Sequence, residues 1–173
     1  MTLAALGTPR LHLRPFTLAD GPFILRLLNE PSFHEHIGDK GVRDLDGARA
    51  YLESGPMASY ARHGHGLLAV ALKTTGEPIG MCGLLKRDNL DHPDLGYAFL
   101  PEFGSKGYAL EAAAATLEDT VAALGYSTLL AIVSPGNTAS INLLGKLGFS
   151  FEKLATLHPG EPAVAVYAWE KGT

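Results

Sequence analysis

The spacing of apolar residues changes repeatedly along this 173-residue chain, and that order restricts the fold more than any other feature. Alternating or continuous apolar runs predict strands over residues 10–16, 66–73, 78–86, 94–100, 128–134 and 163–170. Apolar residues at helical spacing predict helices over residues 17–28, 44–54, 110–124 and 137–147, and Asp44 is the predicted N-cap of the second. The resulting order, β-α-α-β-β-β-α-β-α-β, predicts a mixed α/β sheet.

No charged residue lies between Asp119 and Lys146, so this segment raises the question of a membrane helix. A spanning helix needs about 20 mostly apolar residues in a row. Turn-forming residues interrupt the segment at Gly125, Pro135, Gly136, Asn137 and Asn142. We therefore reject a membrane segment and expect no membrane partner.

The charge balance narrows the range of partners. The chain has 14 Lys and Arg residues against 18 Asp and Glu residues, a net charge of −4, and these charges are scattered. Binding of nucleic acid needs clustered basic side chains, so we expect no nucleic-acid partner. The length predicts one domain over residues 1–173. The single cysteine, Cys82, excludes an internal disulfide, and the opening MTLAALGTPR lacks the features of a secretory signal. We therefore expect a cytoplasmic protein.

Small residues connect the 94–100 strand to the next helix in the segment Gly104-Ser105-Lys106-Gly107-Tyr108-Ala109. A loop that opens a helix presents backbone N–H groups and the positive helix end to an anion. Glycine at positions 104 and 107 lets the backbone approach a phosphate closely, although glycine serves plain turns about as often. The sequence has no G-x-x-x-x-G-K-[ST], G-x-G-x-x-G or G-x-S-x-G motif. A Walker loop, a dinucleotide fold and a nucleophile elbow are therefore not indicated.

The second informative segment is Asn137-x-x-Ser140-x-x-Leu143-Leu144-x-Lys146-Leu147-Gly148-Phe149. Taken alone, it predicts an amphipathic helix that Asn137 caps and that ends at Gly148 in the left-handed conformation. The two segments taken together indicate a particular protein family.

Together they resemble the GNAT superfamily of N-acetyltransferases, and within it the branch of the ribosomal-protein N-terminal acetyltransferases. Four segments fall in the family's order: LHLRPFTLAD, PIGMCGL, DLGYAFLPEFGSKGYALEA and NTASINLLGKLGF. The resemblance implies a central sheet of about seven strands with helices on both faces, splayed between the fourth and fifth strands. The family's loop reads Q/R-x-x-G-x-A/G. Gly107 and Ala109 match it, whereas Gly104 stands where Arg or Gln is usual and Ser105 where a Gly is common.

The resemblance also implies that acetyl-CoA is the cosubstrate. Its diphosphate would be held by backbone groups of Gly104, Ser105, Lys106, Gly107, Tyr108 and Ala109. Its pantetheine would lie in the gap between the 94–100 and 128–134 strands, with Asn137 and Ser140 among the contacts. A backbone N–H near Phe99 or Leu100, where strand pairing is lost, would stabilise the oxyanion.

Two catalytic side chains follow from the same resemblance. Many relatives protonate the leaving thiolate with a Tyr seven residues after the motif Asn, but that residue is Leu144 here. Ser140 is the replacement, as in the ribosomal-protein branch, and the alternative is a hydroxyl with only a capping role. Asp94 stands where relatives often have Glu in an E-[IL]-G-Y run. It would act as a general base through water, and the alternative is a solvated residue at a strand start.

The remaining reactive side chains give weaker indications of function. Residues 34–36 lie where the family's acceptor site forms and His158 precedes the last strand, but we interpret these histidines as surface residues. Neither the His-Glu-His of 34–36 nor the His-Gly-His of 63–65 has metal-site spacing, so we expect no metal. Cys82 lies in an apolar strand without a basic neighbour in sequence, which favours a core residue over a nucleophile.

The basicity of amines bears on the acceptor. At pH 7 an α-amine with a pKa of ~7.7–8.0 is about a tenth deprotonated, whereas a lysine amine with a pKa of ~10.4 is deprotonated to less than about 0.1%. An N-terminal α-amine therefore needs only a weak base. We expect acetyl transfer to a primary amine, with a protein or peptide N-terminus as the first choice. The alternatives are a small amine (a polyamine, an amino acid or an antibiotic) and a coenzyme A-binding module without turnover. The oligomeric state, with a homodimer as one option, stays open.

Overall fold

The computed structural model describes residues 5–172, in which helices flank one sheet of eight strands. The strands are β1 (Leu6–Gly7), β2 (Leu11–Pro15), β3 (Leu67–Leu72), β4 (Pro78–Leu85), β5 (Asp94–Phe99), β6 (Thr128–Val133), β7 (Ser150–Ala155) and β8 (Val164–Glu170). The helices are α1 (Gly21–Leu28), α2 (Pro31–His36), α3 (Leu45–Leu52), α4 (Ala58–His63), α5 (Tyr108–Ala115), α6 (Val121–Leu124) and α7 (Thr138–Lys146). Short helical turns are η1 (Leu18–Asp20), η2 (Glu53–Met57), η3 (Pro101–Phe103) and η4 (Thr116–Thr120). None of these helices has the length and apolar composition that a membrane crossing requires.

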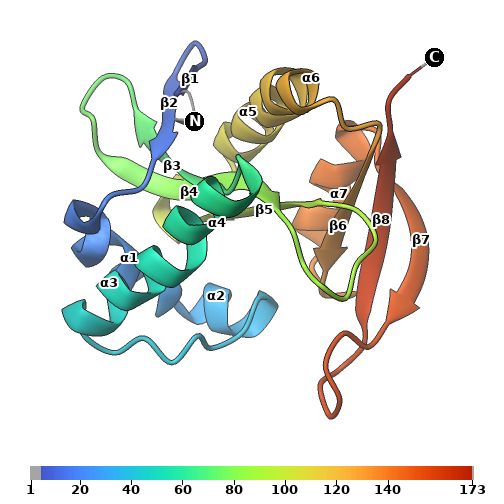
Figure 1. The fold of residues 1–173 in the computed structure, drawn as a ribbon, viewed down its shortest axis with the longest axis horizontal. Coiled ribbons are helices and arrows are strands. Elements are labelled where there is room, and N and C mark those ends of the chain that lie inside the picture. Colours follow the sequence, from blue (N-terminus) through green and yellow to red (C-terminus); the bar gives the residue numbers. More distant parts are fainter. Residues whose placement is uncertain (1–4, 173) are drawn as a thin grey trace.

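The sheet divides between β5 and β6. Its strand order is β1-β2-β3-β4-β5-β6-β8-β7, and neighbours are antiparallel except for the parallel pair β5–β6. That pair has a single register position, Asp94 opposite Leu130, whereas β6 pairs with β8 along its whole length. Figure 1 shows β6, β8 and β7 turned away from the direction of β4 and β5. The mixed sheet that the sequence pattern predicts is confirmed, as is the splay that the family resemblance implies, in a sheet of eight strands where about seven were expected.

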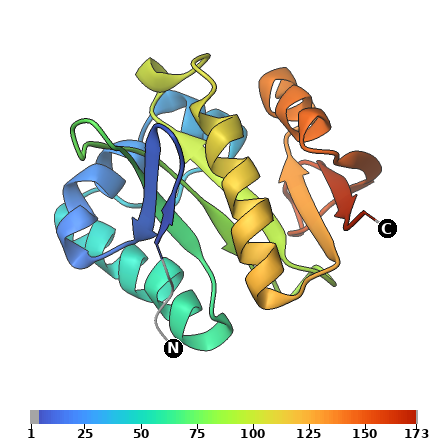
Figure 2. The ribbon, with the colours of Figure 1, turned by 90° about the horizontal axis from the view of Figure 1, so that it is seen from above.

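Helices cover both faces of the sheet, which explains why β3 reads as a continuous apolar run. Successive side chains of a strand point to opposite faces. Leu68 packs in the core cluster that contains Ala112 of α5, and its neighbour Leu67 packs in the cluster that contains Ile24 of α1. In Figure 1, α5 lies above β4 and β5 and α1 to α3 lie below them. Figure 2 shows α5 and α6 as one continuous rod beside β6.

The residues that the sequence marks as helix ends have these roles. The side chain of Asp44 accepts a hydrogen bond from the Gly47 N–H at 2.7 Å and caps α3. The side chain of Asn137 accepts one from the Ser140 N–H at 3.3 Å and caps α7. Gly148 follows α7 with a φ of 94°, the left-handed conformation that ends a helix.

Two strands were not expected from the sequence, β1 and β7. β1 is only two residues long. β7 lies at the sheet edge, with Phe151 and Leu154 more than half exposed (56% and 59%). Its pairing with β8 also shifts register between Phe151 and Lys153. The alternation of apolar and polar residues that reveals a strand is therefore missing from its sequence.

Candidate active site

The gap between β5 and β6 exposes backbone groups of β5. Leu100 donates its N–H to the Ile79 carbonyl of β4 at 2.9 Å, so this amide is not free to stabilise an oxyanion. Backbone groups of an antiparallel strand alternate in direction, so those of Tyr97 and Phe99 face the gap instead. Of the two expected oxyanion donors, Leu100 is therefore excluded, because its N–H is already bonded to Ile79. The role of the Phe99 N–H stays a prediction.

The loop after β5 has the backbone conformation of an anion site. Ser105 has a φ of 60° and Gly107 a φ of 82°, and α5 begins directly afterwards. Within residues 5–172 no acceptor bonds the N–H groups of Ser105 to Ala109. These donors lie at the positive end of α5. Of the predicted segment 104–109, Gly104 already donates its N–H to the Pro101 carbonyl at 3.0 Å, so it offers no free donor. The contact of the other residues with a diphosphate stays a prediction.

Arg10, just before β2, holds this loop in place through its guanidinium group. Its Nη1–H donates to the Lys106 carbonyl at 2.9 Å and its Nε–H to Oε1 of Glu111 at 2.8 Å. Its guanidinium also lies 4.3 Å from the centre of the Tyr108 ring. Burial alone would raise the pKa of Glu111, but hydrogen bonds from Thr8 and Arg10 lower it. The negative charge of Glu111 is thereby kept on the first turn of α5, where the helix dipole favours it.

Ser140 and Tyr97 meet across the gap. Ser140 lies in the first turn of α7, and its hydroxyl forms a hydrogen bond with the phenol of Tyr97 on β5. Burial raises the pKa of Tyr97 to about 12. Leu144, where many relatives of the GNAT superfamily have a Tyr, is only 1% exposed and belongs to the core. Ser140 is thus the hydroxyl that α7 presents to β5, and its chemical role stays a prediction.

Asp94 lies at the closed end of the gap, where β5 still pairs with β6. Its side chain is almost fully buried and receives the Nε–H of Arg87 at 3.1 Å from Oδ1 and 3.2 Å from Oδ2. Burial raises the pKa of Asp94, and the charge of Arg87 opposes that rise. Asp94 is therefore not the solvated residue that the alternative reading describes. Whether it serves as a base stays a prediction.

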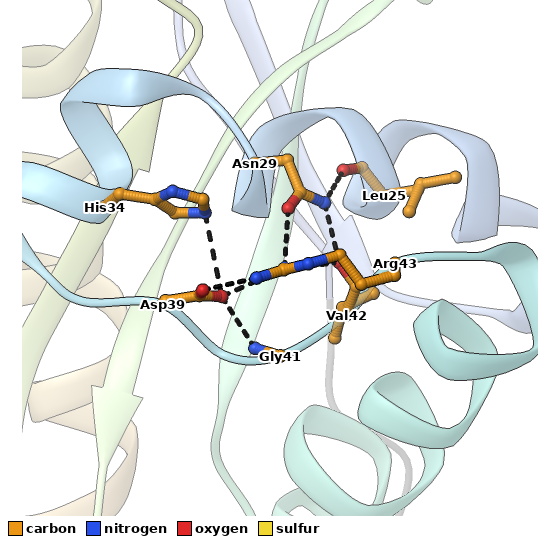
Figure 3. Close-up of polar contacts among 7 residues, drawn as sticks. All are labelled: Leu25, Asn29, His34, Asp39, Gly41, Val42 and Arg43. Atoms are coloured by element: carbon orange, nitrogen blue, oxygen red, sulfur yellow. Dashed lines mark hydrogen bonds and ion pairs between the residues drawn. The ribbon is translucent and has the colours of Figure 1, made fainter.

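The segment between α2 and α3 is held by a cluster of polar contacts (Figure 3). Arg43 pairs with Asp39 and also donates to Oδ1 of Asn29 at 3.0 Å, and its guanidinium lowers the pKa of Asp39 to about 2. The Asn29 amide in turn donates to the carbonyls of Leu25 and Val42 at 2.8 Å. These contacts fix the connection from α1 through α2 to α3.

The end of α2 also touches the other half of the sheet. The hydroxyl of Ser134, the residue after β6, donates to the His36 carbonyl at 2.8 Å. His34 points toward Asp39, with Nε2 at 3.8 Å from Oδ1 (Figure 3). The region after the first helix, where the family resemblance implies the acceptor site, therefore borders the open end of the gap.

The remaining candidates take no part in this site. Across the described residues 5–172, no group of three or more His, Cys, Asp and Glu side chains could hold a metal ion. Cys82 is fully buried, with its Sγ 3.5 Å from Oγ1 of Thr116. Burial raises the pKa of its thiol to about 12. A neutral, enclosed thiol of this kind is a core residue, as expected. His158 lies in the connection between β7 and β8.

Reasoning from the sequence missed three contributors: Tyr97, Arg10 and Arg87. Tyr97 belongs to the D-L-G-Y run, and its position two residues before Phe99 places it on the same face of β5. That spacing could have revealed it. The partners of Arg10 and Arg87 lie 101 and 7 residues away in sequence, and no local pattern identifies either contact.

Comparisons with known proteins agree with this geometry. The family described as Acetyltransferase (GNAT) domain matches residues 10–150. The N-acetyltransferase p20 of Bacillus licheniformis is 27% identical over 154 residues, which are 88% of this chain and 85% of that protein. An acetyltransferase from Agrobacterium tumefaciens str. C58 superimposes with a TM-score of 0.83 at 29% identity and covers 99% of this chain and 96% of its own. RimL, a ribosomal L7/L12 alpha-N-protein acetyltransferase solved with coenzyme A, has a TM-score of 0.83 at 14% identity. The match covers 96% of this chain and 98% of the RimL chain.

Proposed function

The chain belongs to the GNAT family of acetyltransferases, and we propose that it moves the acetyl group of acetyl-CoA to the α-amine of a protein or peptide N-terminus. The family membership establishes an acetyltransferase that uses acetyl-CoA. The choice of acceptor and the roles of individual residues are the proposal. One observation carries the assignment of the site: a gap between two parallel strands opens directly beside a loop of unpaired backbone N–H groups.

The residues around the gap fit acetyl-CoA. The unpaired N–H groups of Ser105 to Ala109 suit a diphosphate, since each can donate to a phosphate oxygen at the positive end of α5. The free backbone edge of β5 at Tyr97 and Phe99 suits the amide groups of pantetheine, which need alternating donors and acceptors. The side chain of Lys106 lies 5.8 Å from the Phe103 ring and adds positive charge to the loop.

Acetyl-CoA supplies the acetyl group as a thioester. Attack by the amine forms a C–N bond and breaks the C–S bond, and over the whole reaction one proton passes from nitrogen to sulfur. Ser140 is the proposed hydrogen-bond donor to the leaving sulfur, because its hydroxyl lies in the first turn of α7 next to the gap. The Phe99 N–H is the proposed donor to the carbonyl oxygen, since its direction into the gap leaves it without a strand partner.

Asp94 is the proposed base, acting through water. It faces the α1–α3 side of the sheet, because Leu95 and Tyr97 occupy the opposite face in the α5 cluster. Burial raises the pKa of its carboxyl, which brings that group closer to the pKa of the amine it must serve. The bond to Arg87 keeps the carboxylate oriented, and the charge of Arg87 opposes the rise of its pKa.

The acceptor is inferred from basicity. A carboxylate that works through water is a weak base, and an α-amine with a pKa of ~7.7–8.0 is partly deprotonated without help. A lysine amine, about 2.5 pKa units more basic, demands far more of the base. Among the neighbours in structure, RimL bears the name of an enzyme that acts on a ribosomal protein N-terminus. At 14% identity this likeness concerns the fold, and it makes a peptide N-terminus the first acceptor to test.

The test is thiol release from acetyl-CoA across matched amines. One peptide has a free N-terminus and no lysine, and its control has an acetylated N-terminus and one internal lysine. A polyamine, free amino acids and an aminoglycoside complete the panel. We expect release with the first peptide and none with its control, and mass spectrometry should place the acetyl group on the α-nitrogen. Release only with a small amine would refute the proposed acceptor, and binding of coenzyme A without release on any amine would refute turnover.

A further inference from the structure

We propose that Tyr97 is a positioning residue for the leaving sulfur: its phenol donates to Oγ of Ser140 and so directs the Ser140 proton into the gap. This inference rests on the proposed role of Ser140. Nothing in the sequence motifs assigns a function to the Tyr97 hydroxyl.

The contact joins the two walls of the site. Tyr97 projects from β5, and Ser140 projects from the first turn of α7, 43 residues later. At this level β5 and β6 are no longer paired, because their one register position is at Asp94. The hydroxyl pair is therefore the direct polar link between the two sides at this point. Both side chains are only half-buried.

The acidity of the two hydroxyls decides which one donates. A phenol, with a pKa of about 10 in water, is a far stronger acid than the alcohol of serine. The better donor is thus Tyr97, with the lone pair of Ser140 as acceptor. Since burial raises the pKa of Tyr97 to about 12, the phenol keeps its proton at neutral pH. Each hydroxyl has one proton, so a proton from Tyr97 to Ser140 leaves the Ser140 proton free for a third partner.

The surroundings leave few other partners for that proton. The Ser140 N–H already donates to Oδ1 of Asn137, and the Ser140 carbonyl is a second, more distant acceptor for the Tyr97 proton, at 3.5 Å. Cys82, opposite Tyr97 in the β4–β5 ladder, is neutral because burial raises the pKa of its thiol. No charged side chain of the described part of the chain bonds to either hydroxyl. With Tyr97 as the donor, the proton of the Ser140 hydroxyl has no acceptor among the described residues and is available to a ligand.

Tyr97 is not itself the proton source. A thiol has a pKa of about 8.5, several units below that of the buried phenol, so net transfer from Tyr97 to sulfur is unfavourable. The amine loses the proton that the sulfur finally keeps, and both hydroxyls end the reaction as they began it. The contribution of Tyr97 is orientation, which makes the hydrogen bond from Ser140 to the developing thiolate stronger.

The test uses Tyr97→Phe, Ser140→Ala and the double variant, with two measurements. The first is the pH at which the thiol of bound coenzyme A ionises, followed by the ultraviolet absorbance of the thiolate. It needs no acceptor, so it is readable whatever amine the enzyme uses. The second is kcat for acetyl transfer, with the dissociation constant of coenzyme A measured in parallel. Tyr60→Phe is the matched control, because the Tyr60 hydroxyl bonds the Phe16 N–H and the Leu67 carbonyl far from Ser140.

We expect Tyr97→Phe and Ser140→Ala each to raise the thiol pKa and to lower kcat about tenfold, the effect of one hydrogen bond. Coenzyme A affinity should stay within about twofold, and the double variant should resemble Ser140→Ala because the two hydroxyls act as one unit. Tyr60→Phe should lower only the thermal stability.

Three outcomes would overturn the inference. If Tyr97→Phe leaves the thiol pKa and kcat unchanged while Ser140→Ala alters both, Ser140 keeps its role and Tyr97 has none. If the effects of the two variants add in the double variant, the hydroxyls act independently. If Ser140→Ala changes neither quantity in an enzyme that turns over, the proposed role of Ser140 fails and the inference fails with it.

Discussion

The Nε–H of Arg87 lies between both carboxylate oxygens of Asp94, at 3.1 Å and 3.2 Å, at the closed end of the gap between β5 and β6. A buried carboxylate without a partner would lose its charge. Burial raises the pKa of Asp94, and the charge and hydrogen bond of Arg87 oppose that rise. The two residues together set the pKa of the carboxyl group that we propose as the base.

The first test follows from the direction of this pKa shift. A base must be deprotonated, so kcat/KM should fall as the pH falls through the pKa of Asp94, which lies above its ordinary value of 3.8. Asp94→Asn should remove this acidic limb and lower kcat/KM about 100-fold. Arg87→Ala should move the limb to higher pH, because a charge that lowers the pKa is lost. A wild-type pH profile in Asp94→Asn would exclude Asp94 as the base.

Glu111 offers a second test, directed at the cofactor loop. Its carboxylate holds Arg10, and Arg10 holds the Lys106 carbonyl. Glu111→Gln should loosen the loop and raise KM for acetyl-CoA about 5- to 10-fold, which corresponds to a loss of roughly 1 kcal/mol of binding free energy. Turnover at saturation should change little. The control is Glu118→Gln, an exposed acidic residue in the same helical rod, which should behave as the wild type. Equal KM values for both variants would show that the Arg10 anchor does not shape the site.

Ser105 has a φ of 60°, which costs a residue with a Cβ roughly 1–2 kcal/mol and costs glycine much less. Ser105→Gly should therefore raise the free energy of unfolding by about 0.5–1 kcal/mol in denaturant titrations, the gain being reduced by the flexibility of glycine when unfolded. Ser105→Ala keeps the Cβ and should give no gain. A stabilising alanine variant would mean that the hydroxyl, and not the backbone conformation, is the unfavourable element.

Local signals in the sequence sufficed for six of the strands and for α1, α3, α5 and α7, but not for β1, β7, α2 and α4. Apolar spacing, the caps Asp44 and Asn137, and Gly148 act within a few residues, and each predicted element formed there. The edge strand β7 escaped prediction because its side chains are exposed, and burial is what produces a periodic pattern.

The candidate site was harder to predict because its contacts join distant segments. Ser140 was identified from its motif, but its partner Tyr97 lies on another element across the gap. The exclusion of the Leu100 N–H depends on strand register, which decides whether an amide faces β4 or the gap. A run of apolar residues does not encode that direction.

His65 gives a last test, of stability rather than activity. It is 1% exposed, and its Nδ1 lies 3.1 Å from the Leu84 carbonyl. A carbonyl only accepts, so Nδ1 carries the hydrogen, and Nε2 is buried without a partner among the described residues. Protonation would place an unpaired N–H and a charge in this enclosed position. Burial accordingly lowers the pKa of His65 below 6.5, although the bond to Leu84 opposes the shift.

The direction in which stability changes with pH follows from proton binding. The unfolded chain takes up a proton near pH 6.5 and the folded chain only at lower pH, so the stabilising effect is complete above pH 6.5 and is lost as the pH falls from there through the folded pKa. His65→Gln retains an N–H for the Leu84 carbonyl but does not titrate. Denaturant titrations from pH 7 down to about pH 5 should show a shallower loss of stability in this variant than in the wild type. The exposed His12→Gln should keep the wild-type slope. Equal slopes in all three proteins would mean that His65 is protonated in the fold without cost.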